Sequence, residues 1–329
     1  MTEVALVPND ALLREETIEV EVTRKVQASL DISTLTLQAT SGADLPSWEP
    51  GAHVDLLLPD GLVRQYSLCG STSDLSSYRI GVLRDPASRG GSAYLHETLR
   101  EGDRLHLRGP RNHFELLPAQ RYVFVAGGIG VTPLVPMTLN ALAAGVDFEF
   151  IYCARNREAM AFADELEDAL GSRLTLNADD KSSVFDLAGY FADVQPDTLV
   201  YACGPGPFLD AVVRATKDWP SGTIHFERFE PLNFDATTNA SFEVELASSG
   251  EVLTVPADRS ILSVLSENGV RVLSSCTEGT CGTCEVGVVG GGETIEHRDA
   301  VLSPEERASG EMLMVCVSRC AGGRLLLDL

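Results

Sequence analysis

The chain has 329 residues, of which 44% are hydrophobic and 22% charged, a composition typical of a folded protein with roughly two or three domains. Its 48 acidic residues outweigh 25 lysines and arginines, and the formal net charge of -23 argues against nucleic-acid binding, which depends on basic residues that neutralise phosphates. The charge indicates either solubility or an acidic face that docks on a basic partner protein. The sequence contains no run of about twenty apolar residues that would predict a membrane span and no recognisable secretory signal, so we expect a cytoplasmic protein.

The N-terminal third is predicted to form an antiparallel β-barrel over residues 17–117, after a tail at 1–16. Apolar or alternating stretches are separated by Gly, Pro, Asp and Ser, and they lie at 17–26, 33–40, 53–59, 63–68, 77–83 and 103–110. Short strands at this spacing are typical of an antiparallel barrel or sandwich.

Residues 118–230 show a different rhythm, in which buried-type strands alternate with helices. A strand from Arg121 runs into glycines and is followed by an apolar helix over 133–144, a strand over 147–154 and an amphipathic helix over 158–170. The alternation continues as far as a helix at 207–216. This pattern predicts a parallel sheet with helices on both faces.

The last part of the chain is predicted to be a separate α+β domain over residues 241–329. The polar stretch 231–240 lacks periodicity and is assigned to a linker. Beyond it, 241–257 has the pattern of a β-hairpin, and 260–270 that of a short helix stopped by Asn-Gly.

Two segments of the predicted barrel carry side chains suited to a flavin and its phosphate. In "RQYSL", Arg64 can offer a guanidinium to a phosphate, Tyr66 an aromatic face and Ser67 a hydroxyl to a ring nitrogen. In "RDPASRGGSAYLHETL", glycines precede a short helix whose bare amides can hold an anion. An ordinary strand with one exposed arginine is the alternative. The predicted flavin contacts are Arg64, Tyr66, Ser67, Leu68, Arg84, Arg89, Gly90, Gly91 and Ser92.

Two glycine-rich turns in the predicted parallel sheet are suited to a nicotinamide dinucleotide. "VFVAGGIGVTPL" and "YACGPGPFL" each place a turn at the carboxyl end of a strand, where the backbone can approach a diphosphate. The first turn departs from G-x-G-x-x-G, and a tight structural turn is the alternative for each. The predicted contacts are Gly127, Gly128, Gly130, Thr132, Cys203, Gly204 and Pro205. Arg155 and Arg157 could contact an adenosine ribose or a 2'-phosphate, which leaves NADH against NADPH open.

Five of the eight cysteines lie in the last sixty residues. Cys276, Cys281 and Cys284 follow the spacing C-x4-C-x2-C, and Cys316 lies thirty-two positions after Cys284. This is the plant-type [2Fe–2S] arrangement. Structural zinc generally uses two C-x2-C-like pairs, so zinc is the less favoured interpretation. Cys316 is favoured as fourth ligand because it lies inside a predicted apolar strand, with Cys320 as the alternative.

The whole order of motifs resembles the phthalate dioxygenase reductase family, the reductase components of two-component Rieske oxygenases such as the vanillate O-demethylase and carnitine monooxygenase systems. The resemblance covers residues 17–329 and rests on "RQYS", "RGGS", "GGIGVTP", "CGP", "HFERF", the C-terminal cysteine spacing, "CVSR" and the ending "LLLDL".

The resemblance implies FMN as the flavin, NADH as the electron donor and the [2Fe–2S] cluster as the one-electron outlet to a Rieske-type oxygenase component. It also implies that Phe229 covers the flavin where nicotinamide enters, so Ser67 and Phe229 are the predicted catalytic residues. Glu227 is expected near the nicotinamide or the flavin, or on the surface. A monomer is expected. The alternatives are a cytochrome P450 or a separate ferredoxin as acceptor, and a non-catalytic redox sensor.

Overall fold

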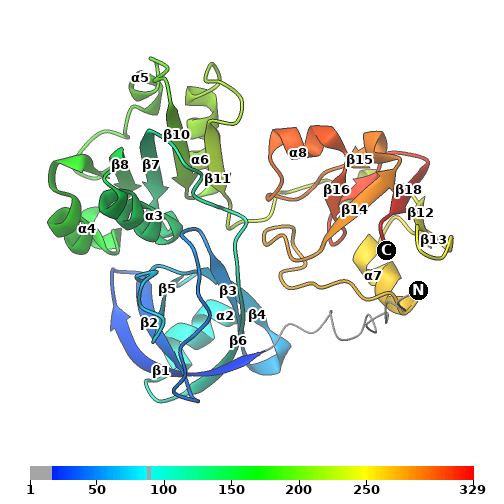
Figure 1. The fold of residues 1–329 in the computed structure, drawn as a ribbon, viewed down its shortest axis with the longest axis horizontal. Coiled ribbons are helices and arrows are strands. Elements are labelled where there is room, and N and C mark those ends of the chain that lie inside the picture. The colour runs from blue at the N-terminus through cyan, green and yellow to red at the C-terminus, as the bar shows by residue number, and fades with distance from the viewer. Residues whose placement is uncertain (1–16, 87–89) are drawn as a thin grey trace, which may run out of the picture. The chain divides into compact units, whose positions relative to one another are not determined.

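The computed structural model describes residues 17–86 and 90–329, which form two compact units, Thr17–Glu230 and Pro231–Leu329 (Figure 1). Each unit encloses hydrophobic cores of its own. The predicted tail at 1–16 and the predicted phosphate contact Arg89 lie outside the described residues.

The first sheet of the unit Thr17–Glu230 is antiparallel, with six strands in the order β4-β3-β6-β1-β2-β5. Its strands are β1 (Ile18–Gln27), β2 (Ile32–Ala39), β3 (His53–Leu57), β4 (Val63–Ser67), β5 (Tyr78–Leu83) and β6 (Arg104–Arg111). Short helical segments in its connections are η1 (Pro59–Gly61), α2 (Gly91–Ala93) and η2 (Tyr94–Thr98). An isolated bridge between Leu68 and Ile80 joins the two edges, so the sheet curls back on itself. The predicted antiparallel domain is confirmed as this curled sheet.

The second sheet of the same unit is parallel, with five strands in the order β11-β10-β7-β8-β9. Its strands are β7 (Arg121–Gly127), β8 (Asp147–Ala154), β9 (Leu174–Ala178), β10 (Thr198–Cys203) and β11 (Ile224–Glu227). The helical elements are η3 (Gly128–Gly130), α3 (Val131–Ala144), η4 (Arg157–Ala159), α4 (Ala163–Leu170), η5 (Gly171–Arg173), α5 (Leu187–Tyr190) and α6 (Gly206–Ala215).

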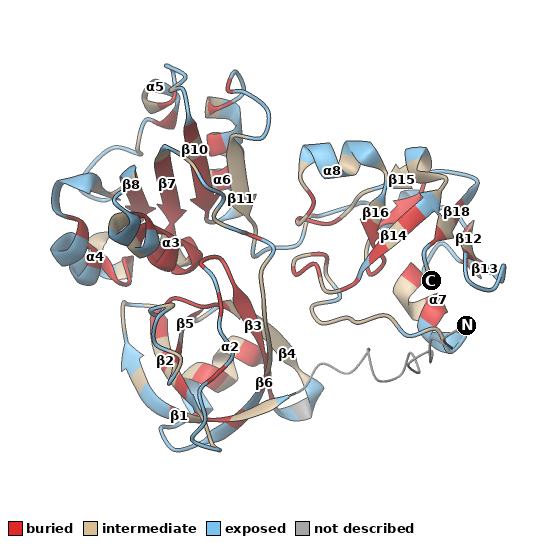
Figure 2. Cartoon of the chain, viewed as in Figure 1, coloured by how far each residue is buried: buried red, intermediate tan, exposed pale blue. Residues whose placement is uncertain are grey.

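Helices cover both faces of the parallel sheet, as the alternation predicted. In β7, Phe124 belongs to the core cluster that includes residues of α3 and α4, whereas Val123 and Val125 belong to the cluster that includes residues of α5 and α6. Successive side chains of a strand point to opposite faces, which explains the division. Figure 2 shows the central strands β7, β8 and β10 buried almost throughout.

The helix predicted over 158–170 is shorter than the sequence pattern indicated. Helix α4 begins at Ala163, after the separate turn η4. Phe162 interrupts the helix because its backbone is left-handed, with φ at 62°, a conformation that a right-handed helix cannot contain. The Phe162 ring instead contacts Arg79 of β5, with the guanidinium carbon 4.8 Å from the ring centroid. A tertiary contact therefore overrides the amphipathic pattern.

The unit Pro231–Leu329 contains a mixed sheet of five strands in the order β13-β12-β18-β14-β16 and a pair β15-β17. The strands are β12 (Phe242–Leu246), β13 (Val252–Val255), β14 (Glu285–Gly290), β15 (Ile295–Glu296), β16 (Met312–Met314), β17 (Arg319–Cys320) and β18 (Arg324–Leu327). The helical elements are η6 (Ala236–Thr238), α7 (Ile261–Glu267), η7 (Gly292–Thr294) and α8 (Pro304–Ser309). The predicted hairpin is the antiparallel pair β12–β13, and the α+β class is confirmed.

Cys316 was predicted to lie inside an apolar strand, and this placement is wrong. Strand β16 ends at Met314, and the chain then turns, with the N–H groups of Val317 and Ser318 donating to the carbonyl of Met314 at 3.2 and 3.0 Å. An apolar run does not distinguish a strand from a buried turn when its carbonyls are bonded locally.

The stretch that precedes β12 is hydrogen-bonded to other residues of its own unit. The Arg298 guanidinium donates to the side chain of Asn239 at 2.8 Å and lies 5.5 Å from the centroid of the Phe234 ring. Arg319 donates to the carbonyl of Ala240 at 3.0 Å. The polar stretch is therefore held by two buried or half-buried arginines of its own unit.

Among the described residues, no helix is both long enough and apolar enough to cross a membrane.

Candidate functional site

The four cysteines predicted to bind metal lie together in the unit Pro231–Leu329. Cys276, Cys281 and Cys284 share one loop, which we call the cluster loop (residues 276–284), and Cys316 lies in the turn after β16. The thiol of Cys276 is within hydrogen-bond reach of those of Cys281 and Cys316. Cys316 also contacts the thiol of Cys284.

These contacts shift the pKa values of the four thiols in opposite directions. Hydrogen bonds from Cys281 and Cys316 lower the pKa of Cys276, and a hydrogen bond from Cys316 lowers the pKa of Cys284. The same bonds raise the pKa values of the donors Cys281 and Cys316. The four sulfurs are therefore close enough to hydrogen-bond to one another, and thiolate is the form in which cysteine binds metal.

The cluster loop is tightly curled, and it directs backbone N–H groups at sulfur. Gly279 and Gly282 have left-handed backbones, with φ at 74° and 75°. The N–H groups of Glu278 and Thr280 donate to Sγ of Cys276 at 3.3 and 3.4 Å. A Cβ on Gly279 would lie 2.7 Å from the Val317 side chain, so a larger residue does not fit there.

This donor set fits a [2Fe–2S] cluster better than a zinc ion. Zinc needs four ligands around one point, whereas the thiol contacts here run in sequence from Cys281 to Cys276, then to Cys316 and on to Cys284. A two-iron cluster is held by four thiolates shared between its irons, which suits four thiols joined end to end by contacts. The N–H groups that donate to Sγ of Cys276 would stabilise the negative charge of such a centre.

Cys320, the alternative fourth ligand, faces a different part of the unit. Its sulfur lies 3.1 Å from the hydroxyl of Thr294 and donates to the carbonyl of Gly322 at 3.1 Å. These contacts lie across the short β15–β17 pair rather than at the cluster loop.

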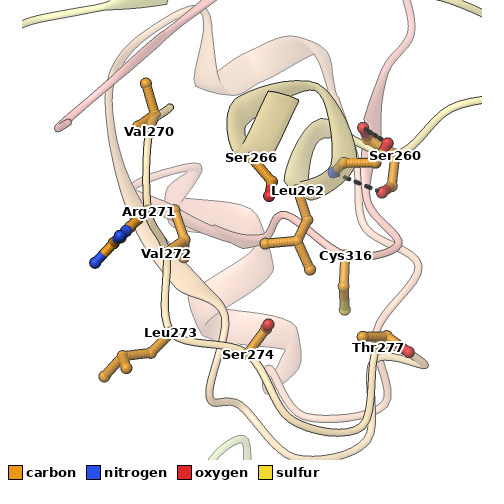
Figure 3. Close-up of a pocket in the computed structure, with 11 residues that line it drawn as sticks. Ser260, Leu262, Ser266, Val270, Arg271, Val272, Leu273, Ser274, Thr277 and Cys316 are labelled. Carbon is orange, nitrogen blue, oxygen red and sulfur yellow. Dashed lines mark hydrogen bonds between the residues drawn. The ribbon is translucent and has the colours of Figure 1, made fainter. Parts of the chain in front are cut away.

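A groove of about 480 Å³ opens beside Cys316. It is lined mainly by hydroxyl and aliphatic side chains: Ser260, Leu262, Ser263, Ser266, Val270, Arg271, Val272, Leu273, Ser274, Thr277 and Cys316. Figure 3 shows the sulfur of Cys316 pointing toward the segment that carries Ser274 and Thr277. Cys316 therefore lines an open groove, while Cys281 and Cys284 are buried.

A second candidate site lies in the unit Thr17–Glu230, where three strands end. Ser67 ends β4, Cys203 ends β10 and Glu227 ends β11, and the last two are paired neighbours in the parallel sheet. The Ser67 hydroxyl bonds to the Glu227 carboxylate, whose Oε2 is inaccessible to solvent and has no hydrogen-bond partner. The serine predicted for the flavin and the cysteine predicted for the nicotinamide thus meet at one buried carboxyl.

Burial dominates the ionisation of this second site. It raises the pKa of Glu227 to about 8, against the opposing effect of the Ser67 hydroxyl. Burial also raises the pKa of the Cys203 thiol, and the neighbouring Glu227 carboxylate adds to that effect. Both shifts favour the protonated, uncharged forms of these two groups.

Other predicted flavin residues form a cradle beside β4. A Cβ on Gly91 would lie 2.7 Å from Cγ and 2.8 Å from Nε of Arg64, so the arginine side chain lies directly across this glycine. Gly90 precedes it with φ at 101°, and the Ser92 hydroxyl accepts a hydrogen bond from the N–H of Asp85 at 3.2 Å. A guanidinium over bare backbone fits a phosphate group.

Three further predicted flavin residues have other surroundings. Tyr66 is half-buried and burial raises its pKa. Leu68 is fully buried, and its N–H donates to the carbonyl of Ala52 at 2.8 Å, so its side chain serves the core. Arg84 is held by Glu97 at 2.7 Å.

The two glycine-rich turns predicted for the dinucleotide pack against each other. Strands β7 and β10 are parallel neighbours, with Ala126 beside Cys203. A Cβ on Gly130 would lie 2.2 Å from the carbonyl oxygen of Cys203, and one on Gly204 would lie 3.0 Å from Cα of Gly127. Gly128 has φ at 55°, Pro205 precedes α6, and the hydroxyl of Thr132 donates to the carbonyl of Ile129 at 3.0 Å. The two turns thus pack backbone to backbone at the carboxyl edge of a parallel sheet, the edge at which dinucleotides bind in folds of this kind.

The arginines that follow β8 are committed to carboxylates. Arg157 donates to Asp164 at 2.5 Å and to Glu167 at 2.6 Å. The guanidinium of Arg155 lies 3.6 Å from Asp31.

Phe229 follows β11 and is 40% exposed. The neighbouring Arg228 bonds to Asp210 of α6 at 2.6 Å, which fixes the chain where it leaves the sheet.

The C-terminal part of the chain matches a family model described as a 2Fe-2S iron-sulfur cluster binding domain, over residues 244–321. The reductase subunit of the toluene-4-sulfonate monooxygenase system of Comamonas testosteroni is 43% identical over 303 residues, which is 91% of this chain and 95% of that protein.

Two solved structures are similar over nearly the whole chain. Phthalate dioxygenase reductase, described as a modular structure for electron transfer from pyridine nucleotides to [2Fe–2S], is 39% identical with a TM-score of 0.70, and the match covers 98% of this chain and 100% of that one. An intact self-sufficient cytochrome P450 monooxygenase is 42% identical with a TM-score of 0.89, and the match covers 95% of this chain. This chain spans only 41% of the P450 structure.

The fold and the two sites define an oxidoreductase in which a flavin domain and a nucleotide domain precede a 2Fe-2S ferredoxin domain. Its relatives are reductase components of oxygenase systems. The chain belongs to the phthalate dioxygenase reductase family, as its motifs predicted.

Proposed function

We propose that the chain is an NADH-dependent reductase, with FMN and a [2Fe–2S] cluster, that passes electrons one at a time to a Rieske-type oxygenase component and acts as a monomer. The observation that carries this proposal is the meeting of Ser67, Cys203 and Glu227 at one buried point in the unit that also holds both glycine-rich turns. A flavin site and a nucleotide site share their inner wall there.

The bound groups supply hydride acceptance at the flavin and one-electron release at the iron–sulfur cluster. The side chains and backbone of the protein hold these groups in position. Arg64 with Gly90 and Gly91 holds the flavin phosphate, and Ser67 presents its hydroxyl beside the protonated Glu227. Phe229 covers the face where nicotinamide enters.

The nucleotide crevice adds the turns that hold the diphosphate. Gly127, Gly128 and Gly130, with Thr132, form one side, and Gly204 with Pro205 forms the other. No acid–base group is required, because correct placement of donor and acceptor supplies the catalysis.

NADH is favoured over NADPH by the surroundings of the two arginines after β8. Arg157 is bonded to two carboxylates and Arg155 faces a third, so both cations already have anionic partners. A 2'-phosphate would have to compete with those carboxylates for them.

A Rieske-type partner is supported by the relatives named for aromatic dioxygenase and demethylase systems. The second candidate is a cytochrome P450, because the self-sufficient P450 structure matches this chain with a TM-score of 0.89. Stopped-flow mixing of the reduced protein with each purified oxygenase distinguishes them, since only the true partner is reduced at a saturable rate.

The proposed function is tested by mixing the purified protein with NADH and cytochrome c. We expect NADH to bleach the flavin absorbance and cytochrome c to be reduced continuously. A protein that shows neither change contradicts the proposal. NADPH in place of NADH serves as the matched comparison and is expected to act more slowly.

The buried carboxyl of Glu227 predicts a pH-dependent stability. Its pKa is about 8 in the folded protein against an ordinary value of 4.5, so over that interval the folded state holds a proton that the unfolded state has lost. Stability therefore falls as pH rises from 4.5 to about 8, and we expect the melting temperature of Glu227→Gln to fall less than that of the parent protein over this range. Thermal unfolding of the two holoproteins across this interval measures it, and parallel curves would contradict the assignment.

A further inference from the structure

A buried turn that begins at Asp299 packs against the cluster loop. Asp299 is fully buried, and its Oδ2 accepts the N–H groups of Val301 at 3.1 Å and Leu302 at 2.8 Å. The next residue, Ala300, donates its N–H to the carbonyl of Gly279 in the cluster loop at 2.7 Å. The shape of this turn thus determines where a donor for the cluster loop lies.

Arg307 of helix α8 holds the turn in place, and His297 lies beside it. Arg307 donates to the carbonyl of Asp299 at 2.6 Å, and its guanidinium lies 3.6 Å from Oδ2 of the same residue. Nδ1 of His297 lies 3.9 Å from Oδ1 of Asp299. The turn and the cluster loop are closely packed, since a Cβ added to Gly279 would lie only 3.0 Å from Cα of Asp299. This packing further restricts motion of the turn.

One peptide group connects the turn to a candidate ligand. The carbonyl of Gly279 accepts from Ala300, while the N–H on the other side of the same peptide belongs to Thr280 and donates to Sγ of Cys276 at 3.4 Å. The peptide bond between Gly279 and Thr280 is trans. In a planar trans peptide the C=O and the N–H point in opposite directions, so fixing one orients the other.

We propose that Asp299 is a positioning residue for electron transfer: by holding the turn that binds Gly279, it orients the Thr280 N–H toward Cys276 and raises the reduction potential of the cluster. The proposal rests on the ligand set proposed above. Hydrogen bonds to ligand sulfurs are among the determinants of the potential of iron–sulfur centres, because they stabilise the reduced, more negative cluster.

The test compares Asp299→Ala with Asp299→Asn in the full-length holoprotein. Both variants lack the carboxylate charge, but only the asparagine keeps an oxygen that accepts the N–H groups of Val301 and Leu302. We expect the midpoint potential of Asp299→Ala to lie below that of Asp299→Asn, by about a tenfold change in the reduction equilibrium, or about 59 mV for one electron. Resonance Raman spectra should also show a smaller deuterium shift of the Fe–S(Cys) bands in Asp299→Ala.

Equal potentials and equal deuterium shifts in the two variants overturn the proposal. If Asp299→Ala does not retain a cluster, the proposal is tested with Arg307→Met and Arg307→Lys. The readout is the deuterium shift, which does not report the change of charge. Equal shifts in the two variants overturn the proposal, and a smaller shift in Arg307→Met supports it. Failure of the ligand set itself is distinguishable, because the parent protein would then lack the electron paramagnetic resonance spectrum of a reduced [2Fe–2S] cluster.

Discussion

Replacing Cys281 with serine is expected to abolish cytochrome c reduction while NADH still bleaches the flavin absorbance. Cys281 is buried, 3% exposed, and its sulfur contacts that of Cys276, so the variant loses one of the four clustered thiols. Serine offers a hard oxygen where the cluster takes a soft thiolate. The flavin and nucleotide residues all belong to the unit Thr17–Glu230, whose cores are separate. The first step should therefore survive when the outlet is lost.

Cys320→Ser is the matched control for this result. Cys320 is also buried, but its sulfur is bonded to Thr294 and Gly322. We expect this variant to keep its iron and its cytochrome c reduction, both measured on the same preparations. Cytochrome c reduction that survives in Cys281→Ser, or disappears in Cys320→Ser, would mean that the ligand set is wrong.

Replacing Gly130 with alanine should raise the KM for NADH and lower the stability of the protein. The added Cβ would lie 2.2 Å from the carbonyl oxygen of Cys203 and 2.5 Å from the amide nitrogen of Gly204. Both are backbone atoms, so the two turns must separate, and overpacking of this kind costs about 1–3 kcal/mol in the free energy of unfolding. Steady-state flavin reduction by NADH and thermal unfolding measure the two effects.

Gly206→Ala provides the control, because its Cβ would meet only the far ends of Arg228 and Glu230, at 3.6 Å. We expect its KM to match that of the parent protein. Dithionite should reduce the cluster in both variants, since the cluster loop belongs to the other unit. An unchanged KM in Gly130→Ala would show that the paired turns do not form the nucleotide crevice.

Much of the fold could be predicted because its elements follow local rules. Strand β8 occupies the residues that its apolar run indicated, and α3 follows the glycine turn and carries Thr132 and Pro133 in its first turn. Helix α4 could not be delimited, because the left-handed backbone of Phe162 depends on a contact with Arg79 from the other sheet.

The candidate sites divide in the same way. The cysteine spacing and the glycine turns are local signals, so the residues they name could be found in the sequence. The burial of Glu227 and its contact with Ser67 arise only when two sheets meet, and "HFERF" carried no sign of a raised pKa. Asp299 was missed for a similar reason, because its role depends on a turn packed against Gly279. A motif records which residues bind, whereas the groups that hold those residues are scattered along the chain.

The stretch before β12 that Arg298 and Arg319 hold bears on where the C-terminal domain begins. The match to the family model begins at residue 244. Asn239 and Ala240, which precede it, accept hydrogen bonds from Arg298 and Arg319 of the same unit. A domain cut at residue 244 would lose the acceptors Asn239 and Ala240, and Arg298 and Arg319 would keep only their bonds to Glu296 and to the carbonyls of Pro256 and Arg259. The compact unit begins earlier than the family match, at Pro231, so we expect a domain expressed from Pro231 to be more stable than one expressed from residue 244.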